Sequence, residues 1–306
     1  MCGSGMRAAM FAADMLAAGS ATVVVAGGME SMSNAPYLVP KGRQGYRYGH
    51  ATLYDHMALD GLEDAYQRGK PMGWFAEQCV TRYGFSRAEQ DRFAIASTER
   101  AVAAHESGAF GWEIAPVAVA GKDGTREVSR DEQPFKAKLD RIPKLKPAFK
   151  PDGTITAANA SSISDGAAAL VLMTEATASR LGIVPLARIA AHAVHAAAPE
   201  WFSTAPIDAI AKVLKRAGWD RRQVDLWEIN EAFAAVPMAA MHDLELAHER
   251  VNVHGGACAL GHPIGASGAR IVVTLLGALR RTGGRRGVAA LCIGGGEATA
   301  MAIERL

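Results

Sequence analysis

The two ends of the chain repeat one order of elements, and this repeat constrains the fold more than any other feature. Residues 6–18 have the composition of a strong helix that Gly19 ends, and residues 21–26 read as a short buried strand. Toward the other end, a predicted helix over residues 269–279 is followed by a predicted strand over residues 288–292. The same order at both ends indicates an internal duplication.

The sequences of the two ends can also be aligned. Residues 3–7 (Gly-Ser-Gly-Met-Arg) align with residues 266–270 (Ala-Ser-Gly-Ala-Arg), and residues 27–30 (Gly-Gly-Met-Glu) align with residues 295–297 (Gly-Gly-Glu). We interpret residues 27–30 and the glycines at 294–296 as turns that close the two strands. Two matches in the same order favour a duplication, and a chance coincidence of glycines is the alternative.

The composition changes between the repeats. Residues 34–155 hold most of the aromatic and basic residues, and they end in an irregular, proline-containing stretch. Within them, residues 86–107 have a helix pattern with Ser86 as the predicted N-cap and Glu89 three residues later, which is a capping box. We predict that residues 34–155 form an inserted loop domain.

An alternation of strands and helices resumes after residue 155. The sequence predicts a strand over residues 169–173, a helix over residues 207–217 and a strand over residues 224–229. Strands that alternate with helices favour a layered α/β fold.

Composition and charge exclude several classes of protein. The 306 residues are 49% hydrophobic and 21% charged, which is typical of a globular protein of up to two domains. A formal net charge of +2 gives no argument for nucleic-acid binding, and the apolar stretches are too short to cross a bilayer. The chain starts with neither a basic leader nor an apolar secretory core, so we expect a cytoplasmic protein. Its four cysteines lack zinc-site spacing and are expected to be reduced.

Cys2 is a candidate nucleophile. It precedes a Gly-Ser-Gly turn that opens a helix, and the free amides and positive dipole end of a helix N-terminus favour a thiolate. The alternative is a buried, inert cysteine, which is the usual state of a free thiol. We interpret Cys79 and Cys258 as packing residues of that kind.

Three further polar residues stand where the chain can present them to a ligand. His262 is followed by Pro263 and framed by glycines, and a neutral imidazole there can accept the thiol proton. The alternative is a structural loop histidine, which is our interpretation of His254. Cys292 ends an apolar strand and enters three glycines whose amides can face an oxyanion. Asn230 follows a predicted strand, and strand ends are where α/β sheets carry function.

Four blocks that contain these residues resemble the signature blocks of the thiolase family, in the order typical of acetyl-CoA C-acetyltransferases. They are Cys2-Gly-Ser-Gly-Met, Asn230-Glu-Ala-Phe233, Gly261-His-Pro-Ile-Gly-Ala-Ser-Gly268 and Cys292-Ile-Gly-Gly-Gly296. The resemblance covers essentially the whole chain. It implies an α/β, layered αβαβα fold of two duplicated halves with an inserted loop domain, which agrees with the repeat described above.

The resemblance also implies a role for each block. Cys2 is implied to be the nucleophile that carries the acetyl group. His262 is implied to activate Cys2 and to form one oxyanion hole, together with a water molecule held by Asn230. Cys292 is implied to be the acid/base at the carbon next to the thioester. The backbone amide of Gly294 and the amide of the nucleophile are implied to form a second oxyanion hole.

The coenzyme site is implied in the same way, residue by residue. The positions that match the lining of the pantetheine tunnel are Ser161, Ala157, Phe149, Met72, Ala232 and Phe233. Lys136 and Lys138 are candidates for the phosphates, because basic residues suit anions. The chain departs from the family at Pro71, where thiolases often carry histidine, so no coenzyme contact is transferred to Pro71. We interpret Glu231 either as an orienting residue or as a charge at a helix N-terminus.

The implied activity is an acyl transfer that condenses two acetyl-CoA molecules to acetoacetyl-CoA and free CoA, with thiolysis as the reverse reaction. We expect no metal or redox cofactor, no nucleic-acid or membrane partner, and a homodimer or homotetramer. The alternatives are a degradative 3-ketoacyl-CoA thiolase of broader chain length and a non-catalytic remnant that binds CoA. A β-ketoacyl synthase is a third alternative, which the Cys292 block argues against.

The domain boundaries follow from the same resemblance. We predict that residues 1–33 and 156–186 belong to the N-terminal thiolase half, residues 34–155 to the loop domain and residues 187–306 to the C-terminal half. Thiolases have strands and helices before the nucleophile's helix, so we expect the first half to lack its N-terminal part. The activity of this chain is therefore a separate question from the activity that its motifs encode.

Overall fold

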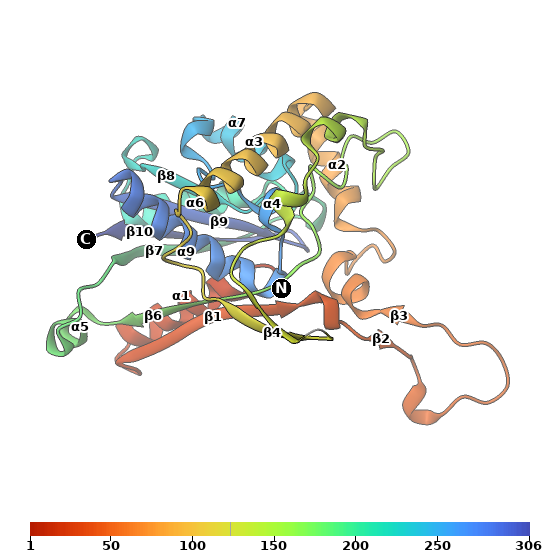
Figure 1. Cartoon of the computed structure of the whole chain (residues 1–306), viewed down its shortest axis with the longest axis horizontal. Coiled ribbons are helices and arrows are strands. Elements are labelled where there is room, and N and C mark those ends of the chain that lie inside the picture. The colour runs from red at the N-terminus through yellow and green to blue at the C-terminus, as the bar shows by residue number, and fades with distance from the viewer. Residues whose placement is uncertain (123) are drawn as a thin grey trace.

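The elements of the chain are stacked in layers in the order sheet, helices, sheet, helices (Figure 1). The structure is a computed structural model that describes residues 1–122 and 124–306. The layered α/β class expected from the sequence is the class observed.

The first layer is a two-stranded antiparallel sheet of β1 (Val23–Ser31) and β6 (Asp165–Met173). Val23 lies opposite Met173 and Ser31 opposite Asp165, so the N-terminal segment pairs with a segment from the middle of the chain. Helices cover one face of this sheet, and its other face is open, with Val25, Met29 and Val171 exposed.

The second layer consists of α1 (Ser4–Ala17) and α9 (Ile264–Thr282), which lie against each other and against the first sheet. Their glycines allow an unusually close crossing. A Cβ at Gly5 would lie 2.9 Å from the backbone nitrogen of Ala269, and one at Gly268 would lie 2.4 Å from that of Met6. The starts of the two helices are therefore in backbone contact.

The third layer is a four-stranded sheet in the order β7, β10, β9, β8, and only the pair of β8 and β9 is parallel. Its strands are β7 (Ala187–Ala196), β8 (Leu226–Ile229), β9 (Arg286–Ile293) and β10 (Glu297–Arg305). The fourth layer packs on the far face of this sheet. Its helices are α6 (Ala205–Ala217), α7 (Ala235–Leu244) and α2 (Met72–Tyr83), of which α6 touches the strands and α7 touches both α6 and α2.

The segment between β1 and β6 carries α3 and several short elements. Helix α3 (Arg87–Glu106) begins at the predicted capping box, in which Ser86 and Glu89 each bond the other's backbone amide, so that prediction is confirmed. The antiparallel strands of this segment are β2 (Tyr37–Leu38) with β3 (Tyr54–Asp55), and β4 (Val117–Gly121) with β5 (Gly124–Val128). The connection between β2 and β3 projects away from the body of the molecule (Figure 1). Short helices complete the chain: α4 (Gln133–Lys136), α5 (Glu175–Leu181), α8 (Ala257–Leu260), the π-helical turn Ala58–Leu62, and the 3-10 turns Met32–Asn34, Gly42–Gln44, Leu139–Lys144, Pro199–Trp201, Arg221–Gln223 and His248–Arg250.

The glycine turn predicted at residues 27–30 is wrong, because β1 continues through Ser31. The glycines serve a close approach instead. A Cβ at Gly27 would lie 2.1 Å from the carbonyl oxygen of Ala168, and one at Gly28 would lie 1.9 Å from that of Gly265. The second of these contacts seats the start of α9 directly on β1.

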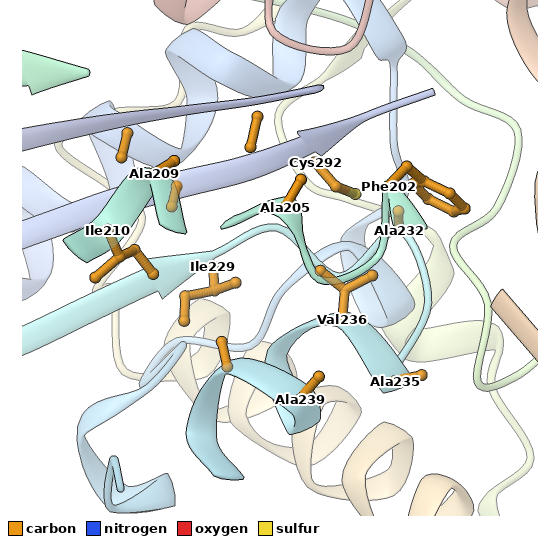
Figure 2. Packing of buried hydrophobic residues seen from close by; sticks show 14 of the residues in the cluster. Phe202, Ala205, Ala209, Ile210, Ile229, Ala232, Ala235, Val236, Ala239 and Cys292 are labelled. Atoms are coloured by element: carbon orange, nitrogen blue, oxygen red, sulfur yellow. The ribbon is translucent and has the colours of Figure 1, made fainter. Parts of the chain in front are cut away.

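Two hydrophobic clusters lie on either side of the four-stranded sheet. One fills the space toward α1 and α9 and includes the fully buried Met6, Leu275 and Leu291. The other lies toward the outer helices, and Figure 2 shows Cys292 within it, near Phe202 and Ala232. Side chains of this size each contribute about 1.5–3 kcal/mol on burial, so the sheet that carries Cys292 is anchored on both faces.

Candidate active site

Cys2 lies just before α1, with Gly3 as the N-cap of that helix. Burial raises the pKa of the Cys2 thiol, while the backbone N–H of Gly294, which donates to its sulfur, and the positive N-terminus act in the opposite direction. A Cβ at Gly3 would lie 2.5 Å from the side chain of Ile293, so the Cys2 loop rests on the end of β9. The nucleophile predicted from the sequence and Gly294 are thus brought together.

Cys292 is the next-to-last residue of β9 and is 1% exposed. Burial, and then the neighbouring charge of Cys2, raise the pKa of its thiol well above the usual range. Gly295 and Gly296 follow with φ of +100° and +91°, a region that L side chains rarely adopt. The chain therefore turns sharply after Cys292 and presents the amide of Gly294 to Cys2.

His262 precedes the N-cap Pro263 of α9, and its ring is 7% exposed. The Ser267 hydroxyl donates to the carbonyl of Pro263 at 3.0 Å and lies 2.5 Å from His262 Nδ1. Since a hydroxyl has one proton, Ser267 accepts from the Nδ1–H, and the Nε2 of His262 is left as a proton acceptor. Burial and then the charge of Arg270 lower the pKa of His262 to about 4, so the ring is neutral at pH 7.

Asn230 immediately follows β8 and is 1% exposed. Its Nδ2 lies 3.5 Å from both ring nitrogens of His262, and its backbone N–H donates to Ala290 on β9 at 2.9 Å. The side-chain oxygen of Asn230 is buried and makes no hydrogen bond to another described residue. An amide held in this way can orient a water molecule or a substrate oxygen beside the imidazole.

Glu231 supports this arrangement from behind. Its carboxylate is completely buried and accepts hydrogen bonds from Ser97 Oγ at 2.7 Å, Asn252 Nδ2 at 2.8 Å and the backbone N–H of Cys258 at 3.0 Å. A Cβ at Gly256 would lie 2.4 Å from the same carboxyl group. Because α7 begins only at Ala235, the helix N-terminal interpretation of Glu231 is wrong and its contacts are those of an orienting residue.

The residues expected to line the coenzyme tunnel form a row that starts at the turn after Cys292, residues 294–296. A Cβ at Gly294 would lie 2.9 Å from the sulfur of Met72, and one at Gly73 would overlap the ring of Phe149. The rings of Phe149 and Phe233 meet edge to face at 5.8 Å.

The remaining predicted coenzyme contacts lie on the turn that faces Phe233. Ser161 donates through both its amide and its hydroxyl to the carbonyl of Ala232, at 3.0 Å each. Ala157 is exposed at the start of this turn. Lys136 and Lys138 are exposed on another segment, and Lys136 pairs with Glu132 at 3.4 Å.

Across residues 1–122 and 124–306, no group of three His, Cys, Asp or Glu side chains is placed to hold a metal ion. In the same described part of the chain, no helix combines the length and apolar character that a membrane span requires.

Comparison with known sequences identifies relatives along the whole chain. The family profile described as "Thiolase, N-terminal domain" matches residues 1–176, and "Thiolase, C-terminal domain" matches residues 183–305. A "Probable acetyl-CoA acetyltransferase" of Dictyostelium discoideum is 49% identical over 307 residues, which are 100% of this chain and 74% of that protein. The cytosolic acetyl-CoA acetyltransferase of Mus musculus is 49% identical over 308 residues, with 100% and 77% covered.

Solved structures agree with the sequence matches. The acetyl-CoA acetyltransferase of Bacillus anthracis superposes with a TM-score of 0.96 at 42% identity, over 100% of this chain and 77% of that one. The Acat5 thiolase of Ascaris suum, solved in complex with coenzyme A, superposes with a TM-score of 0.93 at 43% identity, over 100% and 78%.

Proposed function

Because the chain belongs to the thiolase family, we propose that it is an acetyl-CoA C-acetyltransferase, which condenses two acetyl-CoA molecules to acetoacetyl-CoA and CoA. The single observation that carries this proposal is the environment of the Cys2 sulfur. It accepts a hydrogen bond from the backbone amide of Gly294 and lies beside a second buried thiol, that of Cys292. Two thiols and one neutral imidazole suit a reaction with two successive proton transfers and one covalent intermediate.

In the first half of the reaction, Nε2 of His262 accepts the thiol proton of Cys2 and the sulfur attacks the thioester carbon of acetyl-CoA. The carbonyl oxygen of the thioester becomes an oxyanion, for which the imidazole and a water molecule on Asn230 are the proposed donors. When the carbon–sulfur bond to the coenzyme breaks, the leaving CoA thiolate takes the proton back from His262. The products are acetyl-Cys2 and free CoA.

In the second half, the thiol proton of Cys292 moves to the neutral imidazole of His262, and the resulting Cys292 thiolate removes a proton from the methyl group of a second acetyl-CoA. The resulting carbanion attacks the acetyl carbon on Cys2, and the amides of Cys2 and Gly294 stabilise the oxyanion. The Cys2 thiolate then leaves and takes the proton held by His262, acetoacetyl-CoA is released, and Cys292 keeps the proton that it removed from the methyl group. The raised pKa of Cys292 suits this step, because a thiolate of high pKa is a stronger base toward a weak carbon acid.

The proposed substrates are CoA thioesters, and the mechanism uses no metal or redox cofactor. The protein is proposed to act in the cytoplasm, with support from its 49% identity to the cytosolic mouse enzyme. A homodimer or homotetramer is proposed from the family resemblance.

Substitution of the two thiols tests the proposal. Cys2→Ser is expected to abolish both acetylation by acetyl-CoA and condensation. Intact-protein mass spectrometry measures the acetylation. Cys292→Ser is expected to retain acetylation and to lose condensation. Cys79→Ser is the matched control, since Cys79 is a buried cysteine on α2, and it should change neither reaction. Acetylation that persists in Cys2→Ser would refute the assignment.

A further inference from the structure

Two lysines from separate segments of the chain converge on one indole ring. Lys70 Nζ lies 3.9 Å from the ring centre of Trp74, and Lys150 Nζ lies 4.5 Å from it. All three side chains are half-buried. Cation–π attraction favours each contact separately, but it places two like charges around a single ring.

Neither ammonium group forms an ion pair with a carboxylate in the described part of the chain. Lys70 donates to the neutral side-chain oxygen of Gln67 at 2.8 Å. Within the described residues, neither Lys70 nor Lys150 has a carboxylate oxygen within 4.0 Å. A pair of partly desolvated cations without a carboxylate is suited to an anionic ligand.

The lysine pair lies close in sequence to the row of side chains that starts at the turn after Cys292. Met72 touches Gly294, and Lys70 stands only two residues before Met72. In a separate segment of the chain, Phe149 packs against Gly73, and Lys150 follows Phe149 directly. Each lysine is therefore within two residues of a side chain of the proposed pantetheine tunnel.

We propose that Lys70 and Lys150, held by Trp74, bind a phosphate group of the CoA thioester. The inference rests on the proposed function and specifies which residues hold the charged end of its substrate. A pantetheine arm spans about 16 Å from sulfur to the first phosphorus when extended like a backbone, whereas the two residues from Met72 to Lys70 span about 7 Å before the lysine side chain is added. The pair is therefore within the reach of a coenzyme whose sulfur is at Cys2.

The lysines suggested by the sequence are weaker candidates. Lys136 is exposed and already paired with Glu132 at 3.4 Å, and Lys138 is exposed nearby. Neither stacks on an aromatic ring among the described contacts. An ion-paired, solvated lysine contributes little to anion binding, because its charge is both screened and neutralised.

The test compares two substrates that share the thioester and the arm but differ in the phosphates. The double variant Lys70→Met/Lys150→Met keeps the apolar stems on Trp74 and removes both charges. With acetyl-CoA its KM is expected to rise by roughly 10- to 100-fold at unchanged kcat, as for the loss of charge-assisted hydrogen bonds. With acetylpantetheine, which has no phosphate, KM and kcat should equal those of the unsubstituted protein. Lys70→Arg/Lys150→Arg should restore the KM for acetyl-CoA.

Lys215→Met, at an exposed lysine on α6, is the matched control and should change neither substrate's KM. Dephospho-CoA as a competitor assigns the phosphate: equal loss of its affinity in the double variant indicates the diphosphate, and no loss indicates the 3′-phosphate. An unchanged KM for acetyl-CoA, or an equal rise for acetylpantetheine, overturns the proposal.

A failure of the proposed function itself is recognised separately. In that case the unsubstituted protein shows neither condensation nor acetylation of Cys2. CoA affinity measured by calorimetry on Cys2→Ala, alone and combined with the lysine double variant, then still tests the lysine pair. An equal affinity in the two proteins contradicts it.

Discussion

The two sheets of the molecule differ in how completely they are covered by other elements. Residues 287–293 of β9 are all buried between two layers of side chains. In the β1–β6 sheet, Val25 is 70% exposed and Met29 is 76% exposed. Cys292 is therefore held by its own strand, whereas Cys2 is held mainly by the crossing of α1 over α9 and by the end of β9. The position of the Cys2 thiol therefore depends on contacts between segments from the two ends of the chain.

The difference in burial between the two sheets should have its largest effect on the free energy of unfolding. Leu291→Ala, at a fully buried site in the four-stranded sheet, is expected to lower the free energy of unfolding by about 2–5 kcal/mol. Val25→Ala, at an exposed site in the β1–β6 sheet, should change it by no more than about 0.5 kcal/mol. Urea unfolding followed by circular dichroism measures both. A comparable loss in the two variants would mean that the exposed face of β1 is covered in solution.

The helix crossing should control the reactivity of Cys2. In an ordinary helix Gly→Ala stabilises by about 1 kcal/mol. At Gly268 the added Cβ meets the backbone nitrogen of Met6 at 2.4 Å, so the helices must separate. We expect Gly268→Ala to slow acetylation by about 100-fold, because a misplacement of about 1 Å has that effect. Arg280→Ala, in the last turn of the same helix, is the control, and wild-type acetylation in Gly268→Ala would contradict the crossing argument.

Loss of a hydrogen bond to the Glu231 carboxylate, which lies next to Asn230, should have a smaller effect on stability and activity. Glu231→Gln keeps the size of the side chain but replaces one acceptor oxygen with a donor facing Ser97, Asn252 or the amide of Cys258. We expect a loss of about 1–3 kcal/mol in unfolding free energy and a lower kcat. Thermal unfolding and steady-state kinetics test this, with Glu245→Gln on the surface as the matched control. Unchanged kcat in Glu231→Gln would show that the carboxylate is not needed to orient Asn230.

The pH dependence of stability should show the smallest effect. The pKa of His262 is about 4 in the folded protein, against an ordinary 6.5. Below pH 6.5 the unfolded chain binds a proton that the folded chain does not, so stability falls as the pH decreases from 6.5 to about 4. From pH 7 to 5.5 this residue should account for about 1 kcal/mol. The difference between the protein and His262→Gln in unfolding free energy measures it, and a difference independent of pH would contradict the buried, neutral ring.

Local signals were sufficient for part of the fold. The capping box at Ser86 and Glu89 predicts the start of α3 because it depends on residues three apart. The pair Gly27–Gly28 was read as a turn because sequence alone does not distinguish a glycine needed for a turn from one needed for close packing against Ala168 and Gly265. Strands β7 and β10 were not predicted, since their alanine-rich stretches have no clear alternation.

The site residues also fall into those that the sequence indicated and those that it did not. The resemblance pointed to Cys2, His262 and Cys292. The structure places the Cys2 thiol beside Cys292 and the amide of Gly294, and it places His262 beside Asn230. The sequence left two interpretations of Glu231 open and gave no role to the lysine pair, because the partners of these residues are distant in sequence. Ser97 reaches Glu231 from α3, and Lys150 reaches Trp74 from the segment before β6. A half-buried lysine without an acid nearby is visible only once the chain is folded.

The most direct measurement of the central claim is a map of the acetyl group after acetyl-CoA is mixed with the Cys292→Ser variant. Proteolysis and tandem mass spectrometry locate the modified cysteine. The account predicts acetyl on Cys2, formed faster as the pH rises through about 4, where His262 loses its proton. Acetyl on Cys79 or Cys258, or no acetyl-enzyme while the protein remains folded, would contradict it.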